Sequence, residues 1–524
     1  MKKGLLLMVI AVVALGASVA PPAHAVVCTV DNVPAATLLL PYFEVDLANP
    51  NGADTTFTIN NASATAVLAH VTLWTDLGVP TQTFDIYLTG YDVEKVDLRL
   101  LFAAGVTPRT ASAGQDPAEK ISPHGPVSQD INFASCNGRL PLPPLTAAEV
   151  AHIRAAHTGA ASPTFGGNCS GLAVGDNIAR GYVTIDSVNA CNPFLPDDPL
   201  YVPYITFQNV FFGNFEYVNR TLTTTYAGAL VGVEASFSNP EVSVPGQYTF
   251  YGRYNNYTAT DRREPLATQW QTRILSNAAF GQNTDLIVWR DPGVASTPFA
   301  CGGNPSWYPL PLENLVLFDE QEFPVVPAPA TSNLFAAAAQ RIPASSLGSP
   351  YASGYVRATL SLPAGTGSVN PPEDVRARQS YVFAVTSSNG KYGIGLNGFA
   401  LDTACAVLSH DANQPIVNPF MGTVFPGDGS TNVPVSQKVN FSFSEKVTIT
   451  PTAFKIECPT GSNIPFTSNP AGSGPSFSFQ LTPTPSLPAN TACKATGFAS
   501  QITGTSHVGA NPPADIVTNF TTAP

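Results

Sequence analysis

The densest group of carboxylates in the sequence is Asp319-Glu320-Gln321-Glu322. On a β-strand, Glu320 and Glu322 would point to the same face, about 7 Å apart. Glycoside hydrolases use two carboxylates about 5–10 Å apart, one as the acid and one as the base or nucleophile. Those pairs usually come from different strands, and strand ends also collect acids that face solvent or bind calcium. We therefore expect a solvated strand edge, with catalysis and a calcium site as alternatives.

A second group of chemically versatile residues belongs to one short segment. The capping box Thr146-Ala147-Ala148-Glu149 predicts a helix that ends near Gly159. Glu149 and His152 have the i, i+3 spacing of carboxylate-bridged metal sites, but such sites need the motif twice. His157 does not share a helix face with His152 in the manner of H-E-x-x-H. We expect solvated helix residues here and no metal.

A glycine-rich segment, Gly166-Gly167-Asn168-Cys169-Ser170-Gly171, places a thiol among flexible residues. It is not the G-x-S-x-G of a nucleophile elbow, and it lacks the signature around the cysteine of papain-like enzymes. Cys169 is therefore expected to form a disulfide. The sequence contains no phosphate-binding loop and no dinucleotide fingerprint, so no cofactor is predicted.

Aromatic residues give the best indication of a binding surface. Trp270, Trp289, Trp307 and Tyr308 lie close together in the sequence. Exposed Trp and Tyr stack on sugar rings, but aromatic side chains also fill sandwich cores. The apolar neighbours of Trp289 predict a core position. Trp307 and Tyr308, in a proline-rich turn region, are the candidates for ligand contact.

The composition favours an exported β-protein that does not bind nucleic acid. The chain is 44% hydrophobic and only 11% charged, which is enough apolar content for a core. Its 49 Pro and 41 Gly indicate the frequent turns of all-β sandwiches. A net charge of −12 repels phosphate backbones, so we expect a protein or glycan partner at the cell exterior.

The N-terminal segment predicts export through the Sec pathway. Lys2 and Lys3, the apolar run Leu5–Val13 and the small-residue site Ala23-His24-Ala25 form a signal peptide, residues 1–25, with the mature chain beginning at Val26. The apolar run is shorter than the roughly 20 residues that span a bilayer. We therefore expect no transmembrane segment, and a location in the periplasm, at the cell surface or outside the cell.

Between residues 26 and 412 the pattern is that of antiparallel strands. Apolar and polar residues alternate in 55–60, 67–73 and 84–88, and similar segments recur from 178 to 405. The pattern predicts one large β-rich domain, with two packed sandwiches as an alternative reading.

This region also contains a helix-like segment and a short string that occurs twice. Asn333–Arg341 carries four alanines and precedes Pro343, which predicts a second short helix. Gly181-Tyr182-Val183 recurs as Gly354-Tyr355-Val356, although three residues are too few to establish a repeat.

The C-terminal segment has a different character. Residues 425–450 read FPGDGSTNVPVSQKVNFSFSEKVTIT, with Val439, Phe441 and Phe443 alternating with polar residues. Together with the closing segment Thr518-Asn519-Phe520-Thr521-Thr522, this string resembles the bacterial Ig-like domain of the SbsA type. The resemblance implies an Ig-like β-sandwich over 425–524, joined by a linker at 413–424. Such domains serve as spacers, surface-layer parts and appendages to enzymes, so the resemblance gives no specific function.

Eight cysteines in an exported chain indicate disulfides, and none have the close spacing of zinc ligands. Cys458 and Cys493 are the only cysteines in the Ig-like segment and are expected to pair with each other. For the rest, we expect three pairs: Cys136–Cys169, which would flank the first helix; Cys28–Cys405, at the two ends of the large domain; and Cys191–Cys301. Other pairings remain open, because six cysteines can pair in 15 ways.

The sequence thus predicts an all-β, exported or cell-surface bacterial protein with a structural or interaction role and no evident catalysis. A secreted carbohydrate-binding or carbohydrate-active protein is one alternative. A surface-layer or adhesion component is another.

Overall fold

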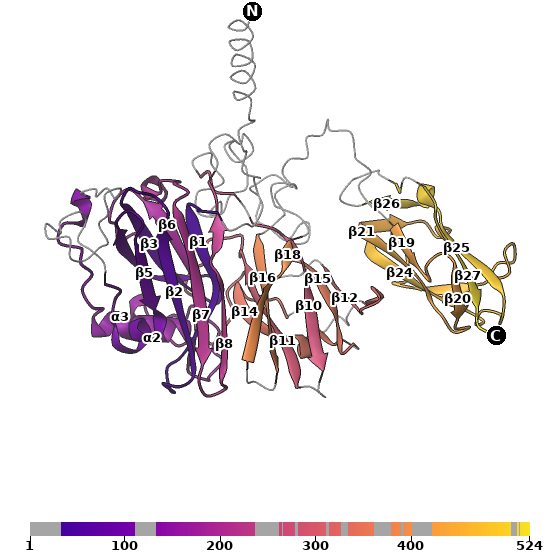
Figure 1. Cartoon of the computed structure of the whole chain (residues 1–524), viewed down its shortest axis with the longest axis horizontal. Coiled ribbons are helices and arrows are strands. Elements are labelled where there is room, and N and C mark those ends of the chain that lie inside the picture. Colours follow the sequence, from indigo (N-terminus) through magenta and orange to yellow (C-terminus); the bar gives the residue numbers. More distant parts are fainter. Residues whose placement is uncertain are drawn as a thin grey trace, which may run out of the picture. The chain divides into compact units, whose positions relative to one another are not determined.

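A computed structural model describes residues 33–109, 133–235, 261–264, 266–277, 281–310, 314–325, 334–349, 351–360, 379–388, 392–400, 422–504, 511–512 and 514–524. Strands dominate it, and their antiparallel sheets pair as sandwiches, which confirms the predicted fold class (Figure 1). The chain divides into two compact units, residues 1–409 and 410–524. The predicted signal peptide, Cys28, Cys405 and most of the predicted linker lie outside the described residues, so these boundaries stay predictions.

Among the described residues, the first unit begins with nine strands, which we call the first sandwich. They form the sheets β4-β3-β6-β1-β9 and β5-β2-β7-β8, and β1 packs against β2 and β7. The strands are β1 (Thr37–Asp46), β2 (Ala53–Asn61), β3 (Val67–Thr75), β4 (Pro80–Leu88), β5 (Val93–Asp97), β6 (Ile178–Val188), β7 (Phe211–Asn219), β8 (Thr224–Ala229) and β9 (Val231–Val233).

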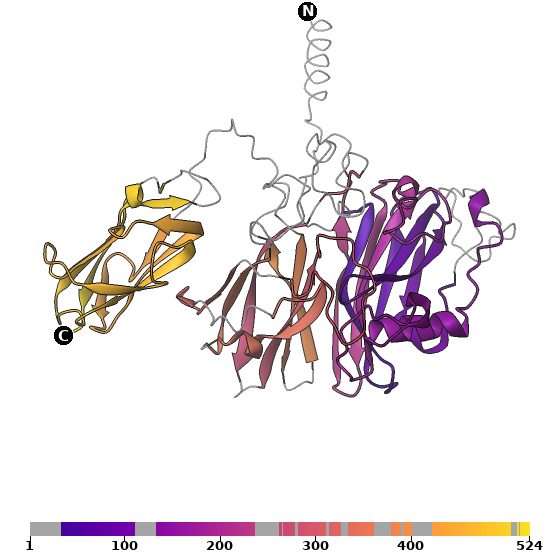
Figure 2. The ribbon, with the colours of Figure 1, turned by 180° about the vertical axis from the view of Figure 1, so that it is seen from behind.

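The next nine strands form the second sandwich, drawn beside the first in Figures 1 and 2. Its two arms, β13-β12-β15-β10-β18 and β14-β11-β16-β17, are joined where the ends of β10 and β11 pair. The strands are β10 (Gln269–Asn277), β11 (Gln282–Arg290), β12 (Asn314–Phe318), β13 (Pro324–Val325), β14 (Ala339–Pro343), β15 (Ser353–Thr359), β16 (Ser380–Ser388), β17 (Tyr392–Asn397) and β18 (Phe399–Ala400).

The two sandwiches have the same topology. Adding nine to each strand number converts every pairing within the first sandwich into a pairing of the second. The helical turn that follows β5, α2 (Leu98–Ala104), also has its counterpart after β14, in η6 (Ala344–Leu347). The large domain is therefore a tandem repeat of one nine-stranded fold.

The register of the two copies agrees residue by residue. Trp74 pairs with Tyr182 in the first sandwich, and Phe318 pairs with Tyr355 at the equivalent place in the second. The short sequence echo seen above falls on these equivalent strands, β6 and β15. A Cβ on Gly181 would lie 1.9 Å from the carbonyl oxygen of Trp74, and one on Gly354 would lie 2.0 Å from that of Phe318. Only glycine fits at either position, which explains why this part of the echo persists.

The hairpin turn after β3 is likewise repeated after β12. The amide of Thr75 donates to the carbonyl of Val79 at 3.0 Å, and that of Asp319 donates to the carbonyl of Phe323 at 3.2 Å. Both turns need one left-handed residue. Gly78 fills that position with φ of 81°, whereas the second copy has Glu322 with φ of 65°.

Glu322→Gly should therefore stabilise the protein by about 1 kcal/mol, because a side chain in the left-handed region is strained and glycine is not. Urea unfolding of the two proteins measures this difference. Gln321→Gly is the matched control, since it adds glycine to the same turn without relieving a left-handed residue, and it should not stabilise. An equal gain from both changes would contradict the explanation.

The two sandwiches of the first unit are packed against each other through several kinds of contact. A disulfide joins Cys169 to Cys301. The ring of Trp289 lies edge-on to Tyr182 with centroids 5.9 Å apart. Arg341 of the second sandwich lies 3.4 Å from a carboxylate oxygen of Glu44 of the first. These contacts make one compact body of the two copies.

The helix prediction at 146–159 is confirmed and the second one is wrong. Helix α3 (Ala147–His157) begins with the predicted capping box, in which both Thr146 and Glu149 participate. Residues 334–338, by contrast, form an irregular turn, and β14 follows and pairs with β11. The alanines at 336–339 are all buried. Pairing and burial there outweigh the helix propensity of alanine.

The second unit is an Ig-like sandwich with sheets β19-β21-β24-β23 and β20-β27-β25-β22, and β26 on β21. The predicted alternation holds, because Val439, Phe441 and Phe443 of β21 are all buried. Asp428, in the first turn, accepts a hydrogen bond from the amide of Asn519 in the closing strand. The strands are β19 (Gly422–Phe425), β20 (Ser430–Val433), β21 (Val439–Ile449), β22 (Phe454–Glu457), β23 (Phe466–Asn469), β24 (Ser476–Pro483), β25 (Ala492–Gly497), β26 (Ile502–Gly504) and β27 (Ile516–Thr522).

Candidate functional site

The acidic run forms the turn between β12 and β13 instead of a strand. The Asp319 carboxylate accepts hydrogen bonds from the amides of Gln321 and Phe323, at 2.8 and 2.9 Å. Glu320 pairs with Arg273 at 2.5 Å, and its side chain is 32% exposed. The run is thus a solvated edge, and Glu320 and Glu322 do not share a strand face. In the described part of the chain, no three His, Cys, Asp or Glu side chains are grouped to hold a metal ion.

The histidines of α3 are buried, so the prediction of solvated residues is wrong for them. Nδ1 of His152 lies 2.7 Å from the Ser162 hydroxyl, and its Nε2 lies 3.1 Å from the Thr81 carbonyl oxygen. Burial lowers the pKa of His157 to about 3. Both rings face the sheet because α3 packs on β3, β4 and β6. His152 and His157 thus bond to uncharged hydroxyl and carbonyl groups, and these bonds hold α3 against the sheet.

Asp76 is a buried acid at the junction of the two sandwiches. Its Oδ1 accepts a hydrogen bond from the amide of Leu172 at 3.0 Å, and its carbonyl accepts one from Ala339 of β14 at 3.0 Å. Burial raises the pKa of Asp76 to about 7. The equivalent residue of the second copy is Glu320, which is exposed and paired with a cation.

Stability should depend on pH through Asp76. Its folded-state pKa lies above the unfolded value of about 4, so the proton-linked stability is complete below pH 4 and is lost as the pH rises to 7. Asp76→Asn keeps an oxygen acceptor for Leu172 and removes the ionisation. The stability of the variant relative to the natural protein should therefore increase between pH 4 and 8, as measured by urea unfolding. A difference that does not vary with pH would contradict this.

Three disulfides lie in the described residues, and two of them differ from the expected pairs. Cys458 joins Cys493, as expected, whereas Cys136 joins Cys191 and Cys169 joins Cys301. The amide of Cys191 donates to the hydroxyl of Ser135, and the backbone of Cys169 pairs with that of Phe299. Hydrogen bonds between distant segments bring these cysteines together, and proximity to a helix in the sequence does not predict such contacts. The bonds fit an oxidising compartment.

The tryptophans have structural positions. Trp270 and Trp289 are 2% and 1% exposed, as the core prediction for Trp289 requires. Trp307, a candidate for ligand contact, is partly buried, and its indole N–H donates to the carbonyl of Leu77 at 3.1 Å. It therefore links the second sandwich to the turn after β3. Tyr308 is partly exposed, and no contact tests its predicted role.

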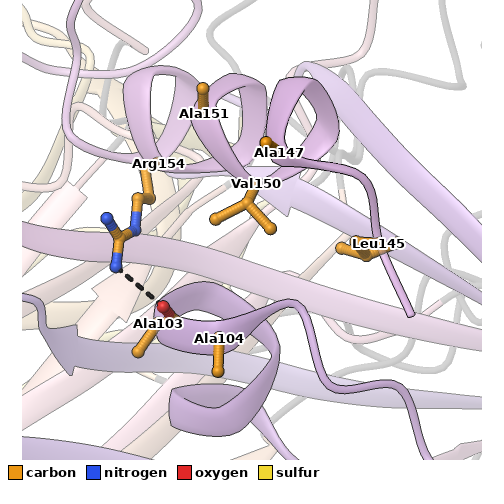
Figure 3. A pocket seen from close by; sticks show the side chains of 7 residues that line it. All are labelled: Ala103, Ala104, Leu145, Ala147, Val150, Ala151 and Arg154. Carbon is orange, nitrogen blue, oxygen red and sulfur yellow. Dashed lines mark hydrogen bonds between the residues drawn. The ribbon is translucent and has the colours of Figure 1, made fainter.

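A pocket of about 440 Å³ lies between α2 and α3 (Figure 3). Its walls are mostly alanine, with Leu145 and Val150. Arg154 supplies the charge, but its guanidinium donates to the carbonyls of Phe102 at 2.7 Å and Ala103 at 3.1 Å. The groove therefore lacks the converging polar groups that orient a small ligand.

A cluster of buried charged side chains lies against β6 of the first sandwich. The sequence analysis did not predict it. Arg263 lies 2.8 Å from the carboxylate of Asp186 on β6 and 2.9 Å from that of Asp261, and all three side chains have no exposed surface. The hydroxyl of Tyr201 also donates to Asp186. Asp261 and Arg263 belong to the charged run Asp261-Arg262-Arg263-Glu264, but no sequence pattern connects this run with Asp186.

One sheet surface of the second sandwich combines aromatic and charged side chains. We call it the β10–β15 face. On β10, Trp270, Thr272 and Ile274 are buried, so the alternate residues point outward. The residues of the face are Gln269, Gln271 and Arg273 of β10, Phe318 of β12, and Tyr355 and Arg357 of β15.

The side chains of this face form rows across the strands. Arg273, Tyr355 and Phe318 are in register, and the Arg273 guanidinium lies 5.7 Å from the centre of the Tyr355 ring. Arg357 donates to the side-chain oxygen of Gln269 at 3.0 Å. The side chain of Arg273 is 46% exposed. By register, Val316 and Thr359 belong to the same face, and both are buried.

Comparison with known proteins identifies a family for the second unit. Residues 415–522 match the model of the bacterial Ig-like domain family. The Ig-like resemblance of the C-terminal segment is therefore confirmed. No curated protein matches the chain. Among the described residues, none of the helices has the length and apolar character needed to cross a membrane.

Proposed function

We propose that this chain is an exported bacterial interaction protein without catalysis, in which a rigid double sandwich is carried next to an Ig-like module. The observation that carries this proposal is the tandem sandwich, cross-linked by Cys169–Cys301 and followed by a bacterial Ig-like domain. Rigid sheets present a fixed surface and lose little conformational entropy on binding. Ig-like domains commonly act as spacers for such surfaces.

The charged side chains described above support a binding role over a catalytic one. Arg263 and its carboxylates are fully buried, and Glu320 is paired with Arg273 at the surface. Glu322 lies in an exposed turn. A hydrolase would need two carboxylates directed into one cleft, with one of them in an apolar environment.

The test is a polysaccharide-degradation screen combined with a glycan array, using the purified chain. We expect binding without release of sugar. Release of reducing sugar that is lost in Glu320→Gln or Glu322→Gln would overturn the proposal. Export is tested separately by expressing the full chain in a bacterium and sequencing the N-terminus of the mature protein. Retention of residues 1–25 on a cytoplasmic product would contradict the Sec assignment.

A further inference from the structure

We infer that the Cys169–Cys301 disulfide is a site of thiol–disulfide exchange, where a partner protein with a reactive pair of cysteines exchanges bonds with Cys301. Partners of this class alternate between a dithiol and a disulfide form. The inference concerns how the chain is oxidised, and it goes beyond the proposed binding role. It rests on the order of the cysteines, on the exposure of Cys301 and on the open backbone around the bond.

The two disulfides described in the large unit cross each other in the sequence. Cys169 lies between Cys136 and Cys191, which are bonded to each other, and its own partner Cys301 lies beyond both. Because a chain is made from its N-terminus, Cys136 and Cys191 are available to Cys169 before Cys301 is. The native pairing therefore requires that Cys169 stays free, or that it exchanges an earlier partner for Cys301.

Chain entropy favours the wrong partners of Cys169 in the unfolded chain. Cys301 is separated from it by 132 residues, whereas Cys136 and Cys191 enclose it within a separation of only 55 residues. Since loop closure becomes less probable with roughly the 3/2 power of loop length, each wrong bond is favoured by about tenfold. Folding reverses this preference, because the backbone of Cys169 pairs with that of Phe299 from the other sandwich. We therefore expect the Cys169–Cys301 bond to form late, on sandwiches that have already folded.

A bond that forms on a folded chain must be accessible there, and Cys301 meets this requirement. Among the described cysteines, Cys301 alone is exposed. Cys169 is 5% exposed, and the cysteines of the other two bonds are between 1% and 6% exposed. An attacking thiolate needs access to the sulfur, so exposed disulfides are the labile ones and buried disulfides are resistant. Exchange is therefore directed to Cys301.

The backbone next to the bond is open on both sides. Gly166 and Gly167 precede Cys169 in the sequence, and Gly302 follows Cys301. All three glycines are exposed, and a Cβ on any of them would meet no described atom within 4 Å beyond its chain neighbours. The carbonyl oxygen of Gly167 lies 3.5 Å from Sγ of Cys301, so the glycines of one segment adjoin the sulfur of the other. The loop of a partner protein thus has room to reach Cys301.

The exchange balances in two steps. In the direction that forms the bond, the Cys301 thiolate attacks the disulfide of the partner, and one partner sulfur leaves as a thiolate. The Cys169 thiolate then attacks Sγ of Cys301 in the mixed disulfide, and the second partner sulfur leaves. Two electrons and two protons pass from the chain to the partner, which ends as a dithiol. In the reverse direction, a thiolate of the reduced partner attacks Cys301, and Cys169 is the leaving group.

The experiment treats the purified, folded full chain with reduced thioredoxin, alkylates the thiols that appear, and maps the labelled cysteines by mass spectrometry. Because a buried bond reacts only when the structure around it opens, Cys169 and Cys301 should be labelled at least about tenfold faster than the cysteines of the other two described bonds. Those two bonds are the internal control. A thioredoxin whose second active-site cysteine is replaced by serine should be trapped as a mixed disulfide on Cys301.

Equal rates for the three bonds, or trapping of the partner on Cys169, would overturn the inference. Two matched variants measure access separately, since Cys169→Ser leaves the thiol of Cys301 and Cys301→Ser leaves that of Cys169. In the absence of denaturant, only the first variant should react rapidly with a soluble disulfide reagent, and similar rates would contradict the inference. Tryptophan fluorescence shows whether both variants are folded. These outcomes are independent of the binding role, which is tested with glycans.

Discussion

Replacing both Cys169 and Cys301 by serine should lower the stability of the large unit by about 5 kcal/mol. The bond closes a loop with a sequence separation of 132 residues, and the loop-entropy relation gives this value for a loop of that size. It also joins the two sandwiches, so its loss leaves the junction to non-covalent contacts. Urea unfolding followed by tryptophan fluorescence reports on this unit, because Trp74, Trp270, Trp289 and Trp307 all belong to it.

The matched control is the pair Cys458→Ser/Cys493→Ser in the other unit. Its sequence separation is 35 residues, and the same relation gives about 4 kcal/mol. This double variant should leave the tryptophan-detected transition unchanged and lower only the transition of the Ig-like domain. An unchanged tryptophan transition in the Cys169/Cys301 variant would show that the other contacts suffice to hold the sandwiches together.

Arg263→Met should destabilise the large unit by about 3–5 kcal/mol, since it leaves two buried carboxylates without the cation that contacts both. Arg263, Asp186 and Asp261 have no exposed surface, so water cannot replace the guanidinium without rearrangement. Urea unfolding of the variant and of the natural protein measures this loss.

Arg273→Gln provides the control for this prediction. It breaks an ion pair of similar distance, Arg273 with Glu320, but one that is exposed. Exposed pairs contribute less than about 1 kcal/mol, so this variant should be nearly as stable as the natural protein. Equal losses in the two variants would mean that burial of the cluster does not determine its contribution.

Local sequence signals predicted the parts of the fold that depend on local physics. The capping box at Thr146 gave the start of α3, and the alternation around Phe441 gave β21. The local signals failed where the structure depends on pairing between segments that are distant in the sequence. The alanines before Ala339 favoured a helix, but residues 339–343 form strand β14, which pairs with β11. The cysteine partners were missed for the same reason, since strand pairing sets which loops meet.

The candidate site was harder to predict than the fold. Trp307 was selected for its exposed sequence context, yet its indole bonds to Leu77. Arg273 and Tyr355 were not selected, because neither has a local motif and they come together only through the pairing of β10 with β15. The repeat itself gave a signal of three residues, Gly181–Val183. Knowledge of the sheet register is needed to recognise that Trp74 and Phe318 are equivalent.

The equivalence of the copies also allows the internal junction to be compared with the outer surface of the first sandwich. Trp289 and Phe383 of the second sandwich contact aromatic rings of the first, and both are buried, as is the neighbouring Val385. At the same positions on its own outer surface, the first sandwich has Asn60, Asn214 and Glu216, which are partly or fully exposed. A further molecule would therefore find hydrated amide and carboxylate groups where the internal junction has apolar side chains. The outer surface of the first sandwich thus lacks the apolar side chains through which the two copies are joined.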